Sequence, residues 1–448
     1  MFVMLMGASS MRGRTSGATP LNILVAEVVQ LWPCWHRGQS LTTSATSDRL
    51  RFSKVQTLYG VERGGRLVLV GVLWVGLALT TIAAETAPPF GVSPQLFRPG
   101  EPALGLKTLP GKHELLYRAT EDGHKFCHHA NLVVFRDELY CMWSNGFVDE
   151  DEPGQWVLYC HSSDGGNWTE ATLLTEHTRG GGYAIATGFV VASEKLVAFY
   201  TGTGSNNFHP DTSLWARKSV DGLAWSEPQR ITSGLFIEAP FRLPGGRWLL
   251  AGEQVGQRRE SGRMRLLTTD QQDGLGGWEE APVTIEKLAT FGYTEPSAFM
   301  RRDGSTALSI RNYSGHLYAS TSSDNGRSWT TPAPTNFPDS LARCSAGNLP
   351  DGTAYLINNP MSKQLDRSLL TIALSRDGVT FDRAWVIRSE PTSLRFSGKH
   401  KIDGWQYPHA LVWKDDLYVA YSINKEDLGI TRIALRELLD DADPGGSE

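Results

Sequence analysis

Five copies of a short motif constrain the fold of this chain more than any other feature. The best copy runs from Ser322 to Trp329, and it contains Ser, Asp, Gly and Trp in that order. Three further copies begin at Ser162, Ser219 and Ser375, and a degenerate copy runs from Thr268 to Trp278. The aspartates stand at positions 164, 221, 273, 324 and 377, so successive copies are 57, 52, 51 and 53 residues apart. A period of this length indicates stacked supersecondary units.

The residue types of the motif explain its role. Aspartate binds backbone N–H groups two residues further on, and glycine adopts a positive φ without a steric penalty. The aromatic residue that follows is expected to pack between neighbouring units. The motif is therefore interpreted as a structural turn without a catalytic part.

A second repeat accompanies the first. Each unit contains two half-buried strands joined by a short polar turn, which is the signature of a β-hairpin. The hairpins span 130–143, 186–201, 239–252, 296–310, 346–357 and 410–422. Units that repeat every 51 to 57 residues have a suitable length for a blade of four strands. We therefore expect an all-β, six-bladed β-propeller of four-stranded antiparallel blades over residues 88–440. Seven blades stay open, because residues 88–125 could supply further strands.

The composition fits a soluble, turn-rich β protein, with 46 glycines, 14 tryptophans and a hydrophobic fraction of 40%. A net charge of −5 and the lack of a Lys/Arg stripe argue against a nucleic-acid partner. The five cysteines form no CxxC pair and no Cys/His metal spacing. Cys127, Cys141 and Cys160 fall within one blade, where either one disulfide or buried thiols would fit.

The N-terminal part resembles a targeting segment. Residues 67–82 form an uncharged run that follows Arg63 and Arg66 and precedes Ala83 and Ala84, which is typical of a signal peptide. We expect a signal peptide within 61–87 and a secreted or periplasmic protein; a membrane anchor is the alternative. Residues 1–60 are interpreted as a non-structural leader or as a start assigned too early, with Val61 as the start. Residues 441–448 are expected to form a disordered tail.

In a propeller, the innermost strands converge on a central axis, so functional side chains should come from the beginning of each blade. These positions hold a set of polar residues: His128, His129, Glu238, Glu295, Tyr407 and His409. A polar residue at one such position could simply line a wet channel, but several at matched positions favour a binding or catalytic site.

Over residues 100–436 the chain resembles the sialidase superfamily. In that superfamily a Glu-Pro opens one blade and an arginine ends its hairpin, which Glu295, Pro296 and Arg311 match. The next blade of the family shows Asn-Pro, a short loop and an arginine. Asn359, Pro360 and Arg367 match this pattern, and Tyr407 matches the tyrosine of the last blade. The repeated motif is the Asp box of this superfamily.

This resemblance implies a glycoside hydrolase that acts on a sialic acid-like or uronic sugar. Tyr407 and Glu295 would form the nucleophile pair, and Arg311 and Arg367 would bind the sugar carboxylate bidentately. Glu238 and His409 would contribute to substrate binding. The acid/base residue is expected on the loop 146–155, where Glu150 and Asp151 are candidates among the four carboxylates at 149–152.

The first blade departs from the family pattern. Its arginine is replaced by histidine, at His128. A propeller-type uronate lyase with His128 or His129 as the base is therefore an alternative, and a non-catalytic carbohydrate-binding propeller is another. No cofactor is expected; a structural calcium stays open, although no EF-hand-like loop supports it. The expected partner is an anionic glycan, and no obligate protein partner is evident.

Overall fold

The computed structural model describes residues 23–26, 58–63, 66–70, 88–175, 182–204, 209–256, 263–285 and 290–440. The chain divides into two compact units, residues 1–85 and 86–448. In the first unit, β1 (Ile23–Ala26), β2 (Leu58–Arg63) and β3 (Arg66–Val70) form an antiparallel sheet in that order.

Several N- and C-terminal predictions fall largely outside these residues. Most of 1–60, the greater part of the apolar run (71–82) and the C-terminal segment 441–448 are not among the described residues. The leader, the signal peptide and the disordered tail therefore stay predictions. In the described ranges, the structure has no helix that is both long and apolar enough to cross a membrane.

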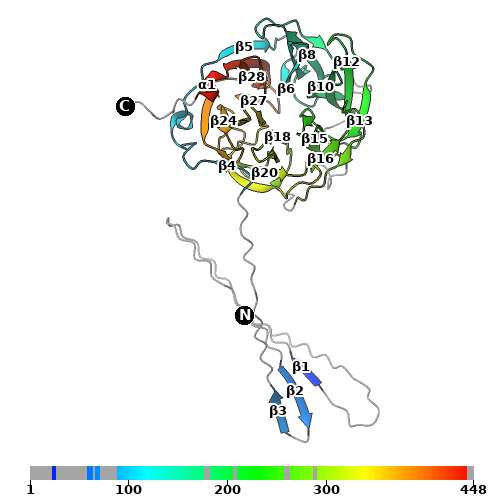
Figure 1. Ribbon diagram of the computed structural model, residues 1–448, viewed down its shortest axis with the longest axis vertical. Coiled ribbons are helices and arrows are strands. Elements are labelled where there is room, and N and C mark those ends of the chain that lie inside the picture. Colours follow the sequence, from blue (N-terminus) through cyan, green and yellow to red (C-terminus); the bar gives the residue numbers. More distant parts are fainter. Residues whose placement is uncertain are drawn as a thin grey trace. The chain divides into compact units, whose positions relative to one another are not determined.

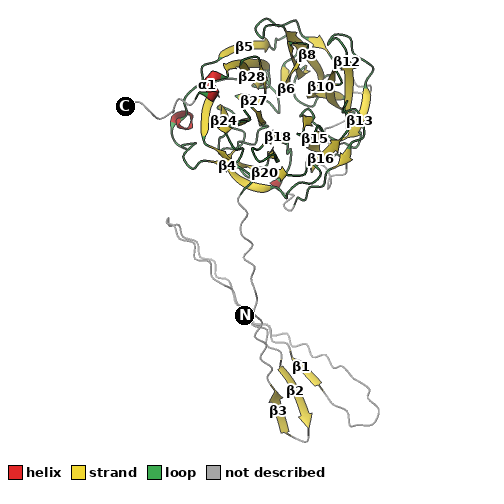
Figure 2. Ribbon diagram, in the orientation of Figure 1, coloured by secondary structure: helices red, strands yellow, loops and turns green. Residues whose placement is uncertain are grey.

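The second unit consists of six antiparallel sheets of four strands each, arranged around a central axis (Figure 1). Figure 2 shows that strands and loops make up nearly all of it. The first blade consists of β6 (Phe126–Phe135), β7 (Glu138–Gly146), β8 (Trp156–Ser162) and β9 (Thr172–Leu173), and the second of β10 (Tyr183–Ala192), β11 (Lys195–Thr203), β12 (Ser213–Ser219) and β13 (Gln229–Ser233). The third consists of β14 (Phe241–Arg242), β15 (Trp248–Glu253), β16 (Met264–Thr269) and β17 (Glu279–Glu280), and the fourth of β18 (Ser297–Met300), β19 (Thr306–Ile310), β20 (His316–Ser322) and β21 (Ala333–Pro338). The fifth consists of β22 (Ser345–Asn348), β23 (Ala354–Asn358), β24 (Leu370–Ser375) and β26 (Arg383–Arg388), and the sixth of β27 (Trp405–Trp413), β28 (Asp416–Ile423), β29 (Asp427–Ala434) and β5 (Lys112–Tyr117). The predicted six-bladed propeller is confirmed.

The last blade closes the ring with a strand from the beginning of the unit. β5 pairs antiparallel with β29, with Thr431 opposite His113. Residues 88–125 thus complete the sixth blade and do not build a seventh. The same segment contributes β4 (Gly91–Val92), which pairs in parallel with β25 (Thr380–Phe381), and the short η1 (Pro102–Gly105). A closed ring leaves fewer strand edges available for aggregation. After β29 the described chain ends with the short helix α1 (Arg436–Leu439).

The repeated motif forms the turn that follows the third strand of a blade, as predicted. In the first blade, Asp164 Oδ1 accepts hydrogen bonds from the backbone N–H groups of Gly166 (2.9 Å) and Asn167 (2.7 Å). Gly165 adopts a φ of +76° and donates its N–H to Ser162 Oγ at 2.9 Å. These bonds are local, which is why the turn is readable from a short stretch of sequence.

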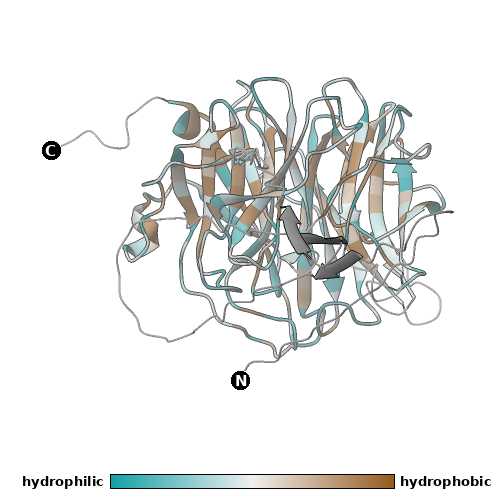
Figure 3. Cartoon of the chain, turned by 90° about the horizontal axis from the view of Figure 1, so that it is seen from below, coloured by the Kyte–Doolittle hydropathy of each residue, from teal (hydrophilic) through white to brown (hydrophobic). Residues whose placement is uncertain are grey.

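The aromatic residue of the motif connects neighbouring blades, as expected. Trp225 of the second blade donates its indole N–H to the Tyr159 hydroxyl of the first blade at 3.2 Å. Buried apolar clusters lie between adjacent blades in the same way; one joins Trp143 of the first blade to Trp413 and Tyr418 of the sixth. Figure 3 shows apolar stretches along the strands of the propeller body. Burial between blades therefore fixes the ring.

The cysteines of the first blade are buried thiols. Cys141 lies directly opposite Cys160 in the β7–β8 register, yet both are free, and so are Cys127 and Cys344. Of the two alternatives left open by the sequence, the structure has the thiols and no disulfide between these residues.

Candidate active site

Irregular backbone at the start of the innermost strands turns polar side chains toward the axis. The β6–β7 register shifts between His128 and Asn131, and the β27–β28 register shifts between Gln406 and His409. His129 (φ +58°) and Tyr407 (φ +52°) lie within these bulges in the left-handed region. Such conformations cost about 1–3 kcal/mol each for non-glycine residues and cluster at functional sites. The bulges therefore mark the candidate site.

These residues border a cavity of about 330 Å³. Seven of the ten predicted site residues line it: Tyr407, Glu295, His129, Glu150, Asp151, Arg311 and Arg367. The lining also includes Tyr293, His400, Lys399 and Lys425. Its four Arg and Lys side chains face three carboxylates (Glu150, Asp151 and Glu295), so the cavity is polar and slightly cationic.

Tyr407, Glu295 and Arg311 form one hydrogen-bonded group. The Tyr407 hydroxyl donates to Glu295 Oε1 at 2.7 Å and accepts from Arg311 Nη1 at 2.7 Å. Arg311 Nη1 also lies 2.5 Å from Glu295 Oε2. Burial raises the pKa of Tyr407 well above its ordinary value, although the Arg311 guanidinium opposes this shift. The phenol therefore keeps its proton in this state and has a carboxylate placed to receive it.

Arg367 is buried differently from Arg311. Its Nη1 donates to Gln406 Oε1 at 2.5 Å and its Nη2 to the Leu341 carbonyl at 3.2 Å, and both acceptors are neutral. Its guanidinium lies 5.2 Å from the centroid of the Tyr407 ring. Among the described residues no carboxylate lies within ion-pair distance of it, and burial lowers its pKa. A desolvated cation without a counter-ion is a natural partner for a ligand carboxylate.

The carboxylates of the loop 146–155 differ in the contacts that they make. Asp149 is buried and accepts the N–H groups of Glu150 and His400, each at 2.9 Å, so it ties the loop to residue 400. Glu150 forms an ion pair with Lys425. Burial alone would raise the pKa of Glu150, but Lys425 outweighs it and holds the pKa below its usual value. Asp151 has a φ of +62° and lines the cavity.

The two histidines lie beside the tyrosine. The rings of His128 and Tyr407 have centroids 3.9 Å apart, and those of His129 and Tyr407 are 5.4 Å apart. Burial lowers the pKa of both histidines, that of His129 to about 3. Together with Glu150 they offer three potential metal ligand atoms that lie within 4.8 Å of one another.

Three predicted residues do not line the main cavity. His128 is fully buried against the Tyr407 ring. Nδ1 of His409 accepts the Leu132 N–H at 3.1 Å and so fixes the first strand of the neighbouring blade. Glu238 forms an ion pair with Arg343, a residue that the sequence analysis missed.

Arg343 could have been found with the rule that identified Glu295. Glu295 precedes the first residue of β18 by two positions, and Arg343 precedes the first residue of β22 by two. Its guanidinium is fully buried, and its Nε and Nη1 have no hydrogen-bond partner in the described part of the chain. The site region thus contains a third buried arginine, supplied by the fifth blade instead of the first.

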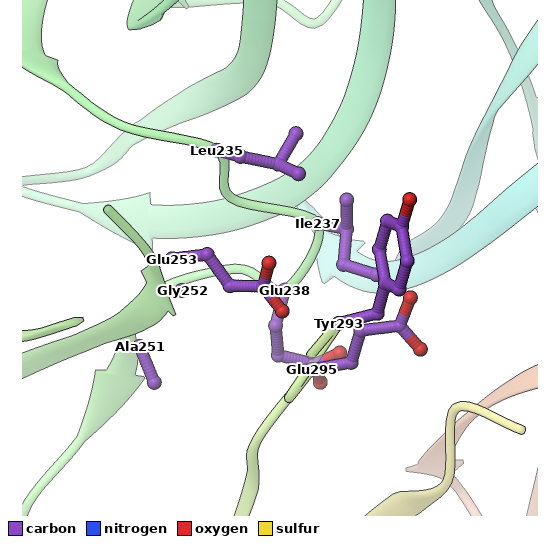
Figure 4. A pocket seen from close by; sticks show the side chains of 8 residues that line it. All are labelled: Leu235, Ile237, Glu238, Ala251, Gly252, Glu253, Tyr293 and Glu295. Atoms are coloured by element: carbon purple, nitrogen blue, oxygen red, sulfur yellow. The ribbon is translucent and has the colours of Figure 1, made fainter. Parts of the chain in front are cut away.

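A small side cavity of about 20 Å³, room for about one water, adjoins the tyrosine site. Figure 4 shows the carboxyl groups of Glu238, Glu253 and Glu295 gathered there beside the ring of Tyr293. Burial, and then the neighbouring Glu295 charge, raise the pKa of Glu253 to about 8. Glu253 was not predicted from the sequence, because it stands at the end of the otherwise apolar strand β15 and matches no motif.

Comparisons with known proteins agree with this architecture. A family model described as a BNR repeat-like domain matches residues 137–419. Similar solved structures include a sialidase (19% identity, TM-score 0.55), which covers 78% of this chain and 35% of that one. A Trypanosoma rangeli sialidase in complex with sialic acid is 12% identical (TM-score 0.57), and the match covers 74% of this chain and 60% of that one.

For two further similar structures, the match extends over nearly the whole length of the other protein. An intramolecular trans-sialidase from Ruminococcus gnavus is 12% identical with a TM-score of 0.54, and coverage is 70% of this chain and 95% of that one. A Dyadobacter fermentans protein of unknown function is 15% identical with a TM-score of 0.56, and coverage is 72% and 99%. At these identities the likeness shows the fold alone. The chain spans about a third of the first of these sialidases and about 60% of the trypanosomal one. No curated protein sequence matches the chain.

Proposed function

Because the chain belongs to the BNR repeat-like domain family and has a sialidase-type propeller, we propose that it is a glycoside hydrolase for a carboxylate-bearing sugar. One observation supports this proposal more than any other. Tyr407, Glu295 and Arg311 form a continuous hydrogen-bonded group at a cavity that also contains Arg367.

The substrate carboxylate would bind at Arg367. Its guanidinium has no carboxylate partner among the described side chains, so a ligand carboxylate would supply the missing counter-ion through paired N–H donors. Lys399 and Arg311 also line the cavity and add positive charge. Arg311 is already engaged with Glu295 and Tyr407, so its principal role is to hold this pair in position.

The bond changes then follow from the tyrosine–glutamate pair. As Tyr407 Oη forms a bond to the anomeric carbon, its proton passes to Glu295, and the bond from that carbon to the leaving oxygen breaks. An acid protonates the leaving oxygen. Water then attacks the anomeric carbon, the bond to Tyr407 breaks, and Glu295 returns the proton to the phenolate. This sequence of two displacements retains the anomeric configuration.

Among the loop carboxylates, Asp151 is the proposed acid/base residue. Asp149 is buried and is not among the residues that line the cavity, whereas Glu150 lines it as part of the cluster with His128 and His129. Asp151 lines the cavity together with Tyr293 and Glu295, which lie just before β18. It would protonate the leaving oxygen in the first step and take a proton from water in the second.

A uronate lyase is the second candidate, and a specific observation favours it. The imidazole of His128 lies against the Tyr407 ring, and neither of its ring nitrogens has a hydrogen-bond partner among the described residues. In that reaction His129, the histidine of the pair that lines the cavity, would take the proton α to the carboxylate, and Tyr407 would protonate the leaving oxygen as the C–O bond breaks. A non-catalytic carbohydrate-binding propeller is the third reading.

One screen separates the three functions. The purified protein is incubated with sialosides and with uronate-containing glycans, and new reducing ends and ultraviolet absorbance are followed together. A hydrolase produces reducing ends without an unsaturated product, whereas a lyase produces an unsaturated uronate that absorbs in the ultraviolet. Binding of these glycans without turnover would support the third reading.

We also propose export through the segment 61–87, which fractionation of producing cells would test.

A further inference from the structure

His128, His129 and Glu150 form a cluster that the proposed hydrolysis does not use. Nε2 of His128 lies 3.9 Å from Glu150 Oε1, and Nε2 of His129 lies 3.7 Å from the same oxygen. These distances are too long for hydrogen bonds. The three side chains therefore converge without bonding to one another.

A divalent metal ion fits between these atoms. Ligands at about 2.1 Å from a tetrahedral zinc ion lie roughly 3.4 Å apart. The two His–Glu150 separations of 3.9 and 3.7 Å are slightly wider, and all three ligand atoms lie within 4.8 Å of one another, so side-chain movements of about 1 Å would close the site. Two histidines and one glutamate are also a ligand set known from catalytic zinc sites, in which the fourth position stays open.

His128 provides a second, independent observation. Its side chain is fully buried, and neither ring nitrogen has a hydrogen-bond partner within the ranges that the structure describes. A buried polar group without a partner costs about 1–3 kcal/mol. A metal ion beside His128 would satisfy one of these nitrogens and remove much of this cost.

The surroundings orient the other two ligands. Nδ1 of His129 lies 3.1 Å from Ser144 Oγ, and when Nδ1–H donates this bond, Nε2 presents its lone pair toward Glu150. Lys425 pairs with Glu150 Oε2, which leaves Oε1 facing the histidines. Such outer partners commonly fix the ligands of metal sites.

We propose that His128, His129 and Glu150 bind a divalent transition metal ion, with Zn²⁺ as the preferred ion, at the edge of the cavity. His129 and Glu150 line the cavity, so the open coordination position faces a bound ligand. The ion would supply positive charge at the first blade, where histidine stands in place of an arginine. This last role rests on the proposed function, whereas metal binding itself does not.

The test measures metal binding without any substrate. Metal-free protein is titrated with Zn²⁺ by calorimetry, and the zinc content after dialysis is measured by mass spectrometry. We expect about one zinc ion per chain. Glu150→Gln and His129→Ala should each weaken binding by more than about 100-fold, and Ser144→Ala by about 10- to 100-fold.

His400→Gln is the matched control, because His400 lines the same cavity outside the cluster. It should bind Zn²⁺ like the wild type, and near-ultraviolet circular dichroism should show that each variant is folded. A zinc content well below one per chain would overturn the proposal, and so would unchanged affinity in Glu150→Gln and His129→Ala. Neither result depends on whether the protein hydrolyses a glycan.

Discussion

The hydroxyl of Tyr407 donates a hydrogen bond to Glu295 Oε1 at 2.7 Å, although the two residues are 112 positions apart in the sequence. Both residues have left-handed backbone conformations, with φ values of +52° and +38°. Tyr407 lies in the bulge of β27, and Glu295 lies two residues before β18. The fold thus holds a proton donor and its acceptor together in a buried, strained arrangement.

Substitution of the two cavity arginines should affect stability to different extents. Arg311→Met leaves the buried Glu295 carboxylate without its ion-pair partner, so unfolding should become easier by about 3–5 kcal/mol. Arg367→Met removes a buried cation with no carboxylate partner among the described residues, so its melting temperature should not fall by a comparable amount. Thermal melts of both variants test this contrast, and equal destabilisation would contradict it.

Arg367→Met should also separate substrates by charge. Turnover of a carboxylate-bearing glycoside should fall by about 10²-fold or more, since a desolvated, charge-assisted pair of about 3 kcal/mol is lost. Binding of a neutral glycoside that lacks the carboxylate should not change. The measurement is kcat/KM for matched substrate pairs, and an equal loss with both members of a pair would exclude a carboxylate-specific role.

Arg343 and Glu238 should behave as a coupled pair. Arg343→Met strips the partly buried Glu238 of its counter-ion, and a loss of up to about 3–5 kcal/mol in unfolding free energy is expected. The double variant Arg343→Met/Glu238→Gln should recover most of this loss, because no unpaired charge remains. Denaturant unfolding of the wild type, both single variants and the double variant gives the coupling energy. Strictly additive effects would show that the ion pair is unimportant.

Glu253 should make stability fall with rising pH. Its pKa is raised from 4.5 to about 8 in the folded protein, mainly by burial. Between these values the folded state keeps a proton that the unfolded state has released, so stability declines from about pH 4.5 to about pH 8. The total effect is on the order of a few kcal/mol. Calorimetry across this range should show that the stability of Glu253→Gln declines less than that of the wild type. Glu279→Gln, an exposed control in β17, should show the same decline as the wild type.

Substitution in a repeated turn should lower stability without affecting the site. Gly222 has a φ of +79°, and a Cβ atom there would lie 2.3 Å from the hydroxyl of Tyr140 in the neighbouring blade. Gly222→Ala should therefore cost more than about 1 kcal/mol. Thermal melting measures the loss, and unchanged kcat with a soluble glycoside is the control. A variant as stable as the wild type would contradict the role assigned to this glycine.

The sequence predicted the blades well because their signals are local. Asp164, Ser162 and Gly165 bond within one short turn, so the residues that form the turn also identify it. Blade positions then brought Glu295 and Tyr407 into register. By contrast, the roles of the loop carboxylates were not readable, because the conformation of the loop depends on the contact between Asp149 and His400, 251 positions away.

Arg343 and Glu253 show two different reasons for omission. Arg343 occupies a blade-opening position and follows the same spacing as Glu295, but its ion pair with Glu238 joins residues 105 positions apart. Glu253 ends an apolar strand, and only the neighbouring blade supplies the hydrogen bond from Thr294 and the charge of Glu295 that distinguish it. In both cases, the partners of the side chain come from contacts between residues that are far apart in the sequence or belong to another blade.

The most direct test of the account is the release of an aryl leaving group from aryl sialosides and aryl glucuronides by the wild type and by Tyr407→Phe. The variant keeps the aromatic ring against His128 and removes only the hydroxyl. Near-ultraviolet circular dichroism should confirm that its fold is retained. We predict hydrolysis of at least one of these substrates by the wild type, and a rate that is about 10²- to 10⁴-fold lower for Tyr407→Phe. Equal rates for the two proteins, with no unsaturated product, would contradict a tyrosine nucleophile at this site.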